Sequence, residues 1–427
     1  MSLFGAMSTA ISGLTAQAAA FTNISDNTAN SQTIGYKGVD TNFIDYLTAS
    51  SATSNQSGSV LTTPGYTNEV QGTINQSDDP LAMAINGQGF FAVSQQNGTS
   101  STGAVTFQAQ QAYTRAGDFQ LDKNGYMVNS AGETLDGYSI NPATGVVNTS
   151  ALTPIQVPQT QLQPIPTANV SLVANVPATP TAASNLTSSV QIYDAQGNTH
   201  QLDTTWAQTG ANAWTLSLSS PDNQPAATIG SVNVTFNANG TLATLAGATG
   251  SVAVGGSATD AAVTLSPTFA GTAQNISLNL GTFGAATGVT QYAGTDYNLE
   301  STSQDGAAAG SFTGATTAST GVVTANYSNG QSVAIAQVPV ITFANADALQ
   351  SQSGQAFTQT TNSGVAIAQG ESQNSAGSLV IGSTEGSNVD IATELSKLIV
   401  AQQAYGANAK VIATANQLLQ TTIDIKQ

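Results

Sequence analysis

Both ends of the chain carry apolar residues at alternating intervals of three and four, and this pattern constrains the fold more than any other feature. Such spacing gathers the apolar side chains on one stripe of an α-helix, as in a coiled coil. It predicts one helix from residue 3 to about residue 28 and a second over 390–425. The stripe residues that we expect at an assembly interface are Leu3, Met7, Ala10, Leu14, Phe21, Ile24, Ile391, Leu395, Leu398, Tyr405, Ala409, Ile412, Leu419 and Ile423.

These stripes leave two structures open. The helices could form a hairpin within one chain or lie on a sheet as core helices, or they could pair with each other and with copies in neighbouring chains. An isolated helix is marginal in water, and we favour the second arrangement. Asn388 is a candidate N-cap of the C-terminal helix, and Asp390 lies near the positive end of its dipole.

Between the ends the apolar period changes from about 3.5 to two, which is typical of β-strands. Turn sequences at 122–125, 194–198 and 237–240 separate alternating segments and predict three β-hairpins. Residues 276–280 also alternate strictly. The middle of the chain therefore reads as short strands of β-sandwich or barrel-like domains.

Composition along the middle suggests where the domains begin and end. Prolines cluster over 154–166, and a passage rich in Gly, Ala and Thr follows at 281–296, so one β unit is expected to be inserted in another. The predicted class is multidomain α+β, with paired coiled-coil-like terminal helices and two mainly β outer domains. The expected domains are a helical domain (1–30 and 388–427), a connecting extended or β segment (31–71 and 363–387), a β domain (72–166 and 291–362) and an inserted outermost β domain (167–290).

The charge balance excludes several classes of function. The chain has 23 Asp and Glu against 6 Lys and Arg, a formal net charge of −17, and no cationic residue between Lys123 and Lys397. Nucleic acids and anionic membrane surfaces are bound by basic patches, so we expect neither as a partner. No run of 18 apolar residues is present, and no membrane insertion is expected.

The residues needed for catalysis or metal binding are scarce. The absence of cysteine excludes disulfides and thiolate sites, and a single histidine, His200, excludes a site with two imidazoles. Asp122 begins a turn that lacks the further ligands of a calcium loop, and His200 is expected to have an ordinary surface or hydrogen-bonded role. We predict no catalytic, cofactor-binding or metal-binding residue, although scattered carboxylates leave a glycosidase pair open. On composition alone, a secreted β-rich adhesin or surface-binding module is the alternative to a structural polymer.

Longer motifs at both ends carry a family resemblance. Residues 23–30 (NISDNTAN), 33–37 (TIGYK), 85–93 (INGQGFFAV), 387–390 (SNVD) and 398–405 (LIVAQQAY) resemble signatures of the bacterial flagellar rod and hook axial proteins. The large inserted segment and the returning strands near 327–331 (YSNGQ) resemble the hook members of this family. The signature residues are Asn27, Ala29, Asn30, Gly35, Tyr36, Lys37, Gly89, Phe90, Phe91, Asn388, Val389 and Asp390.

The resemblance implies a structural subunit and no enzyme. Such a subunit would assemble into a flexible helical tube, the hook, which acts as a universal joint between rod and filament and encloses the export channel. The implied partners are further copies of the chain, the distal rod protein, the hook cap protein, the hook–filament junction protein and the flagellar type III export apparatus. The implied location is extracellular. Residues 1–36 contain no Lys or Arg, so export without a cleavable signal peptide is expected.

Overall fold

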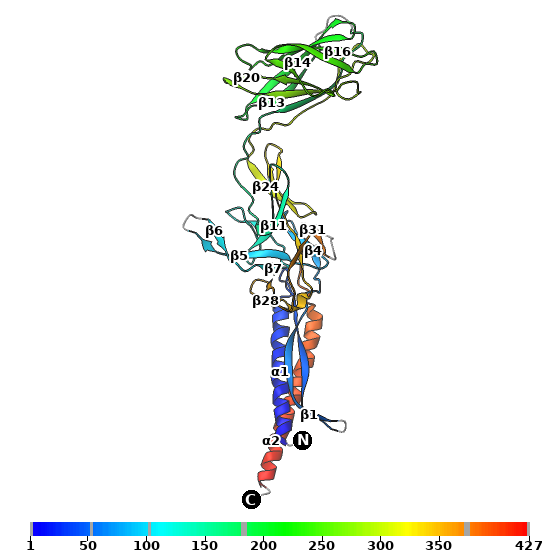
Figure 1. Cartoon of the computed structure of the whole chain (residues 1–427). Coiled ribbons are helices and arrows are strands. Elements are labelled where there is room, and N and C mark those ends of the chain that lie inside the picture. The colour runs from blue at the N-terminus through cyan, green and yellow to red at the C-terminus, as the bar shows by residue number, and fades with distance from the viewer. Residues whose placement is uncertain (1–2, 52–53, 101–103, 181–185, 371–375, 425–427) are drawn as a thin grey trace. The chain divides into compact units, whose positions relative to one another are not determined.

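A computed structural model describes residues 3–51, 54–100, 104–180, 186–370 and 376–424. Two long helices occupy the ends, α1 (Leu3–Ala29) and α2 (Ile391–Asp424), and strands with one short 3-10 helix, η1 (Ala346–Ala348), form the rest (Figure 1). The prediction of two terminal helices around a mainly β middle is therefore confirmed. No helix of the described ranges is long and apolar enough to cross a bilayer.

Contacts between residues divide the chain into two compact units. The first unit comprises Met1–Gln159, Gly314–Ala325 and Ser332–Gln427. The second unit comprises Thr160–Thr313 and Asn326–Gln331.

In the first unit a long hairpin lies along α1 (Figure 1). Its strands β1 (Val39–Ser51) and β2 (Ser54–Tyr66) pair antiparallel. Asn23 Nδ2 donates to Thr41 Oγ1 at 2.8 Å, and the Val60 amide donates to Ser12 Oγ at 3.1 Å. The polar side chains of α1 therefore hold both strands beside the helix.

The β part of the first unit is one large sheet with three short ladders. Among the described residues the sheet follows the order β24 (Phe312–Thr317), β25 (Val322–Tyr327), β26 (Ser332–Gln337), β10 (Glu133–Ile140), β5 (Phe91–Thr99), β7 (Ala112–Thr114), β29 (Ala356–Thr358) and β28 (Gln350–Ser351), with β6 (Val105–Phe107), β8 (Gln120–Leu121), β9 (Met127–Val128) and β11 (Val147–Pro154) at its sides. The ladders are β3 (Ile74–Gln76) with β32 (Ser383–Glu385), β4 (Met83–Asn86) with β31 (Ser378–Ile381), and β27 (Val340–Thr342) with β30 (Ile367–Gln369). Two of these ladders pair strands near the beginning of the chain with strands just before α2.

The second unit is a sandwich of two sheets around one core. One sheet has the order β18 (Val252–Gly255), β19 (Asp260–Leu265), β22 (Ile276–Thr282), β12 (Asn169–Asn175) and β23 (Asn298–Gln304). The other has the order β13 (Leu186–Tyr193), β14 (Thr199–Gly210), β15 (Ala213–Ser219), β16 (Thr228–Phe236) and β17 (Leu242–Gly250), and β20 (Thr268–Phe269) with β21 (Thr272–Ala273) forms a small hairpin. Alternate residues of both sheets meet in a core that includes Trp206 and Trp214.

The three hairpins predicted from turn sequences are confirmed. The 122–125 turn joins β8 to β9, the 194–198 turn joins β13 to β14, and the 237–240 turn joins β16 to β17. Asp122 Oδ1 accepts from the amides of Asn124 and Tyr126, at 2.8 and 2.7 Å. A short acidic side chain therefore closes the turn, as its sequence indicates.

The boundary between the units differs from the expected one. We expected residues 291–362 to return to the first β domain, but β23 pairs with β12 and the second unit continues to Thr313. The side chains of β23 are almost all exposed. Its sequence therefore lacks the apolar alternation by which a strand and its sheet can be recognised.

The first residue of β10 is a buried carboxyl group. Glu133 is 5% exposed, and its Oε2 accepts from Asn129 Nδ2 at 2.9 Å. Burial is the main cause that raises the pKa of Glu133, and the charge of Asp118 adds to it, while the hydrogen bond from Asn129 lowers the pKa. The resulting pKa is about 7, against an ordinary value of 4.5. Between these values the folded chain binds a proton that the unfolded chain has lost, so stability falls as the pH rises from 4.5 through 7.

Replacing Glu133 by glutamine should remove this pH dependence. At pH 8 we expect Glu133→Gln to be more stable than the parent by up to about 3 kcal/mol, and at pH 4.5 we expect the two to be nearly equal. Calorimetric unfolding at both pH values measures the difference, with Asp78→Asn, at an exposed carboxylate of the same unit, as the control. An equal difference at both pH values would contradict the role given to Glu133.

Candidate assembly interface

The turn after α1 is organised by one buried asparagine. Asn27 is 2% exposed, and its Oδ1 accepts from the Val39 amide (2.9 Å) and the Tyr36 hydroxyl (3.2 Å). Its Nδ2 donates to the Val39 carbonyl (3.0 Å) and to Glu394 Oε2 (3.3 Å). A side chain with both a donor and an acceptor is needed for this set of bonds. Asn27 thereby joins the end of α1 to the start of β1 and to the first turn of α2.

The chain leaves α1 through a glycine in the left-handed region. Just after the exposed Ala29, the amide and side chain of Asn30 donate to the Asp26 carbonyl. Gly35 then has φ of +70°, and its amide donates to the Glu385 carbonyl at 2.8 Å. A Cβ at this position would lie 2.3 Å from the backbone nitrogen of Ala116. Both the dihedral angle and the close approach therefore require glycine.

Three buried charges connect distant parts of the first unit. Lys37 Nζ lies 2.5 Å from Glu385 Oε1, and Arg115 Nη1 lies 2.8 Å from Glu385 Oε2; each of the three side chains is at most 1% exposed. The Gly72 amide also donates to Glu385 Oε1, at 2.8 Å. The cations donate further to three backbone carbonyls, those of Val70, Ile85 and Gly87.

The charges of this network do not cancel, because two cations share one carboxylate. Burial lowers the pKa of Lys37 and that of Arg115, while the charge of Glu385 raises both. The Arg115 guanidinium also lies 5.3 Å from the centre of the Phe90 ring, where a cation–π contact is favourable. Removal of Glu385 would therefore leave two buried positive charges without their counter-ion.

The start of α2 differs from the predicted cap. Asp390 is the N-cap, since its Oδ1 accepts from the Thr393 amide at 2.7 Å. Asn388 instead accepts from the Gly38 amide (2.8 Å) and donates to the carbonyls of Thr67 and Val70. The prediction that Asn388 caps α2 is wrong. Asparagine is a common N-cap residue, but the side-chain amide of Asn388 makes its hydrogen bonds to residues beside the β1–β2 hairpin instead. Val389, between these two residues, is partly buried.

The contact between α1 and α2 is a seam of small residues. The side of α1 that is buried consists of Ala10, Gly13, Ala16, Ala20, Ile24 and Asn27, and on α2 the buried residues are Glu394, Ala401 and Ala415. A Cβ on Gly13 would lie 2.7 Å from Asn408 Nδ2, so the Asn408 side chain packs directly on the backbone of α1 at Gly13. The Phe21 and Tyr405 rings pack edge to face at the margin, 6.1 Å apart.

The predicted stripe residues accordingly divide into three groups. Ala10 and Ile24 are buried, Met7, Leu14, Phe21, Leu398, Ile412 and Leu419 are partly buried, and Ile391, Leu395, Tyr405 and Ala409 are exposed. The side chains of Leu3 and Ile423 lie outside the described residues. Of the buried alanines of the two helices, Ala10 lies on the predicted stripe, whereas Ala16, Ala20, Ala401 and Ala415 lie outside it.

Additional large apolar side chains of both helices are exposed. The residues are Phe4 and Ile11 on α1 and Ile399, Val400, Val411 and Leu418 on α2, each 43% to 69% exposed. On the hairpin, Phe43, Ile44, Tyr46 and Leu61 are 47% to 60% exposed. The helical part of the first unit therefore presents large apolar side chains on several sides.

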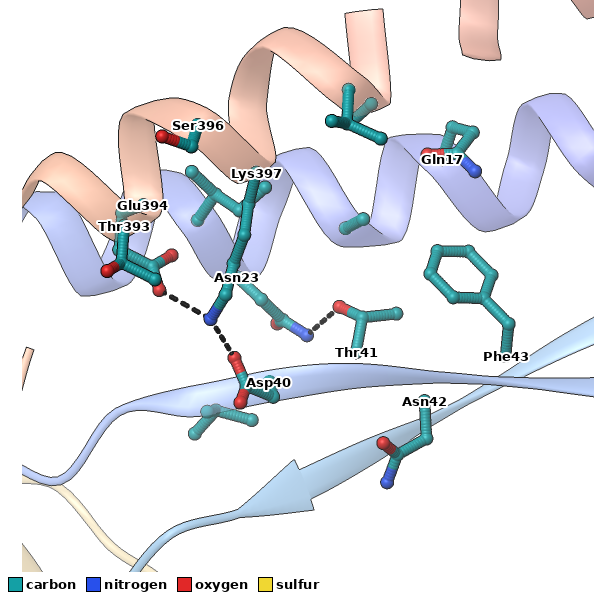
Figure 2. Close-up of a pocket in the computed structure, with 15 residues that line it drawn as sticks. Gln17, Asn23, Asp40, Thr41, Asn42, Phe43, Thr393, Glu394, Ser396 and Lys397 are labelled. Carbon is teal, nitrogen blue, oxygen red and sulfur yellow. Dashed lines mark hydrogen bonds and ion pairs between the residues drawn. The ribbon is translucent and has the colours of Figure 1, made fainter.

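A groove runs between α1, α2 and β1 (Figure 2). Its volume is about 570 Å³ and its walls include Ala20, Phe43 and Val400. Lys397 crosses one end and donates to Asp40 Oδ1 (2.5 Å) and Glu394 Oε1 (2.8 Å) (Figure 2). Burial is the largest single effect on Lys397 and lowers its pKa. The hydrogen bonds to Asp40 and Glu394 and the charges of these carboxylates act together in the opposite direction, so the pKa is raised overall. The ammonium group thus holds β1 at a set distance from α2.

The signature residues Gly89, Phe90 and Phe91 lie in the β part of the first unit. Gly89 has φ of +132°, and a Cβ there would lie 2.2 Å from Val340 Cγ1. Phe90 packs edge to face on Phe343 and Phe357, and Phe91 packs on Phe119. Of these residues, Phe90 is the one whose ring lies under the Arg115 guanidinium. Within the described residues no cluster of three or more side chains could hold a metal ion.

Comparison with known proteins relates these features to one family. The family models that match are the Flagellar hook protein FlgE/F/G D1 domain over residues 84–172, the Flagellar basal body protein FlaE D2 domain over 160–307 and the Flagellar basal body rod FlgEFG protein C-terminal over 381–425. The flagellar hook protein FlgE of Rhizobium meliloti is 33% identical over the full length of both chains. The chain belongs to the flagellar hook protein FlgE family.

Other relatives agree with this assignment. The flagellar hook protein FlgE of Escherichia coli K12 is 32% identical, covering 99% of this chain and 100% of that one. The crystal structure of Helicobacter pylori flagellar hook protein FlgE2 matches with a TM-score of 0.51 and 15% identity, covering 71% of this chain and 98% of that one, which shows a shared fold. The chain is thus a structural subunit of the flagellar hook, as the sequence motifs indicated.

Four residues important in this hook protein were absent from the predicted interface: Arg115, Glu385, Glu394 and Lys397. A signal for them exists in the composition. The chain has only six Lys and Arg residues, and Lys37, Arg115 and Lys397 all form ion pairs in the first unit. In a chain with only six Lys and Arg residues, each of them is a candidate for a structural ion pair.

Replacing Glu385 by glutamine should destabilise the first unit strongly. The substitution keeps the shape but leaves Lys37 and Arg115 buried without their counter-ion, which costs about 3 to 5 kcal/mol. Urea unfolding followed by circular dichroism at 222 nm, where α1 and α2 dominate, measures the loss. Lys123→Gln, at an exposed cation, is the matched control and should change stability by less than about 0.5 kcal/mol. A small effect of Glu385→Gln would show that the network is dispensable.

Two glycine substitutions should separate backbone strain from close packing. Gly35 and Gly145 have nearly equal φ, +70° and +69°, but only Gly35 has atoms within reach of a Cβ. We expect Gly145→Ala to cost about 1 kcal/mol and Gly35→Ala to cost more than about 3 kcal/mol, measured by the same urea unfolding. Similar costs at the two sites would mean that the contact with Ala116 does not constrain the fold.

Proposed function

We propose that the two terminal helices and the β1–β2 hairpin are the assembling part of a hook subunit that polymerises into a flexible tube. The observation that carries the proposal is the set of large apolar side chains left exposed on α1, α2 and the hairpin. Exposed apolar patches of this extent mark interaction sites, and a polymer of identical subunits supplies the partner. Each half-exposed side chain would contribute about 1 kcal/mol when covered.

The expected division of the chain becomes part of this proposal. Residues 1–30 and 388–427 would pair in a coiled-coil-like manner and line the export channel, with 31–71 and 363–387 as the connecting segment. The two β domains would contribute outer contacts, the outermost being inserted in the other. Subunits related by a head-to-tail contact that does not close form helical filaments, as a hook requires.

A torque-transmitting universal joint must exchange contacts as it turns. Only 7% of the residues are charged, so the outer contacts would be mainly polar and water-mediated. Such contacts can be exchanged at low cost, since neither strong pairing nor desolvation of charges is involved. The low charge content therefore suits a tube whose subunits shift relative to one another.

The proposed partners follow from the place of a hook in the flagellum. They are the distal rod protein, the hook cap protein, the hook–filament junction protein and the type III export apparatus. We propose an extracellular location, with export that needs no cleavable signal peptide.

Introducing a charge on the exposed face of α2 should block assembly while the subunit stays folded. Leu395→Asp and Ile399→Asp place carboxylates at positions 49% and 54% exposed. We expect the critical concentration for tube formation, measured by sedimentation and electron microscopy, to rise about tenfold or more for each. Removal of residues 389–427 should abolish the tubes.

Val254→Asp is the matched control, because Val254 is a 45% exposed aliphatic residue of the second unit. It should leave the critical concentration within about twofold of the parent, and circular dichroism should show unchanged helix content in every point variant. Normal tubes from the truncated chain, or from both α2 variants, would refute the proposed interface.

A further inference from the structure

The single histidine of the chain lies between two carboxylates in the second unit. His200, at the start of β14, has its Nε2 3.3 Å from Asp194 Oδ2 and its Nδ1 3.0 Å from Asp222 Oδ2. The side chains of His200 and Asp194 are 13% and 10% exposed, and that of Asp222 is 53% exposed. The ring also stacks on Phe269 of β20, with 3.9 Å between centres and 5° between planes.

The two contacts make different demands on the neutral and the charged ring. A neutral imidazole carries one N–H and can donate to one carboxylate only, so its other nitrogen presents a lone pair to the second carboxylate. The imidazolium carries two N–H groups and can donate to both. Two carboxylates at hydrogen-bonding distance therefore suit the protonated ring better than the neutral one.

The carboxylate of the turn is ionised over the whole range in which a histidine changes charge. Burial acts to raise the pKa of Asp194, but hydrogen bonds from Asn198, His200 and Gln196 lower it to about 2. Among the described residues, Asp194 and Asp222 are the charged groups paired with the ring. Histidine is the side chain type that ordinarily changes charge between mildly acidic and neutral pH.

No side chain of the second unit other than His200 can carry a positive charge. The sequence has no Lys or Arg between Lys123 and Lys397, so His200 is the one side chain in that stretch that can become positively charged. Its protonation would create the first positive charge among the acidic residues of the sandwich.

The ring contacts three segments of the second unit. Asp194 belongs to the β13–β14 turn, Asp222 to the loop after β15, and Phe269 to the β20–β21 hairpin. The neighbouring Asn223 accepts from the Thr268 amide at 2.7 Å, so the loop is already attached to β20. Stronger hydrogen bonds from a protonated His200 ring would therefore hold the turn, the loop and the hairpin together.

We propose that His200, Asp194 and Asp222 form an acid-strengthened clamp that stabilises this edge of the second unit when the ring is protonated. The clamp makes the second unit more stable in mildly acidic surroundings and less stable at alkaline pH. It is independent of the assembly of the helices, because all its members lie in the second unit.

The two tryptophans of the chain allow the clamp to be tested in the full-length protein. Trp206 and Trp214 are both buried in the core of the second unit, so their fluorescence reports the unfolding of that unit. Thermal unfolding is measured for the parent and for His200→Gln at pH 8.0 and pH 5.5, below the concentration at which tubes form. We expect the Tm advantage of the parent over His200→Gln to be about 2 to 4 °C larger at pH 5.5 than at pH 8.0.

Two asparagine variants complete the test. Asp222→Asn removes one carboxylate from the ring and should reduce the pH-dependent part of the advantage. Asp203→Asn removes a carboxylate of β14 that bonds Gln201 instead of the ring, and should leave it unchanged. A Tm advantage equal at the two pH values, larger at pH 8.0, or unaffected by Asp222→Asn would overturn the clamp.

A spectroscopic measurement gives an independent result that does not depend on unfolding. With ¹⁵N-labelled histidine there is one ring to observe in the whole chain. At pH 5.5 both ring nitrogens should carry protons protected from exchange with water. Rapid exchange of both protons would show that the carboxylates do not hold the ring, and would also overturn the proposal.

Discussion

The first unit depends on one buried carboxylate that serves two cations. Glu385 pairs with Lys37 and Arg115, residues 348 and 270 positions away in the sequence, and accepts from the Gly72 amide as well. Because α1 ends shortly before Lys37 and α2 begins shortly after Glu385, this contact sets the end of α1 and the start of α2 relative to the sheet. Asn27 and Asn388 extend it with neutral hydrogen bonds, so the junction is held by groups that all need exact partners.

Small and large apolar residues have separate roles in the helical part. Alanines and Gly13 are buried along the contact between α1 and α2, and at Gly13 the Asn408 side chain packs directly on the backbone of α1. The large residues stand at the margins or face outwards, where a second copy can cover them. This arrangement explains how one subunit can keep its helices paired and still retain the apolar surface that a polymer of the hook family requires.

The scarcity of charge has opposite consequences in the two units. In the first unit Lys37, Arg115 and Lys397 form ion pairs, and Lys397 joins the β1 strand to α2 across the groove. In the second unit there is no Lys or Arg, so its carboxylates repel one another and His200 alone can offset them. Polar, uncharged surfaces elsewhere are consistent with contacts that can be remade as a hook rotates.

The sequence by itself determined the two helices, the β middle, three of its hairpins and the family, because these follow from local periodicity, turn chemistry and contiguous motifs. It did not determine that β23 belongs to the second unit, that Asp390 and not Asn388 caps α2, or that Glu385 joins Lys37 to Arg115. Each of these features depends on partners far away in the chain. A strand with exposed side chains, or a single buried charged residue, produces no periodic pattern of apolar residues in the sequence. Only the tertiary structure decided them, since burial and pairing are properties of neighbours in space.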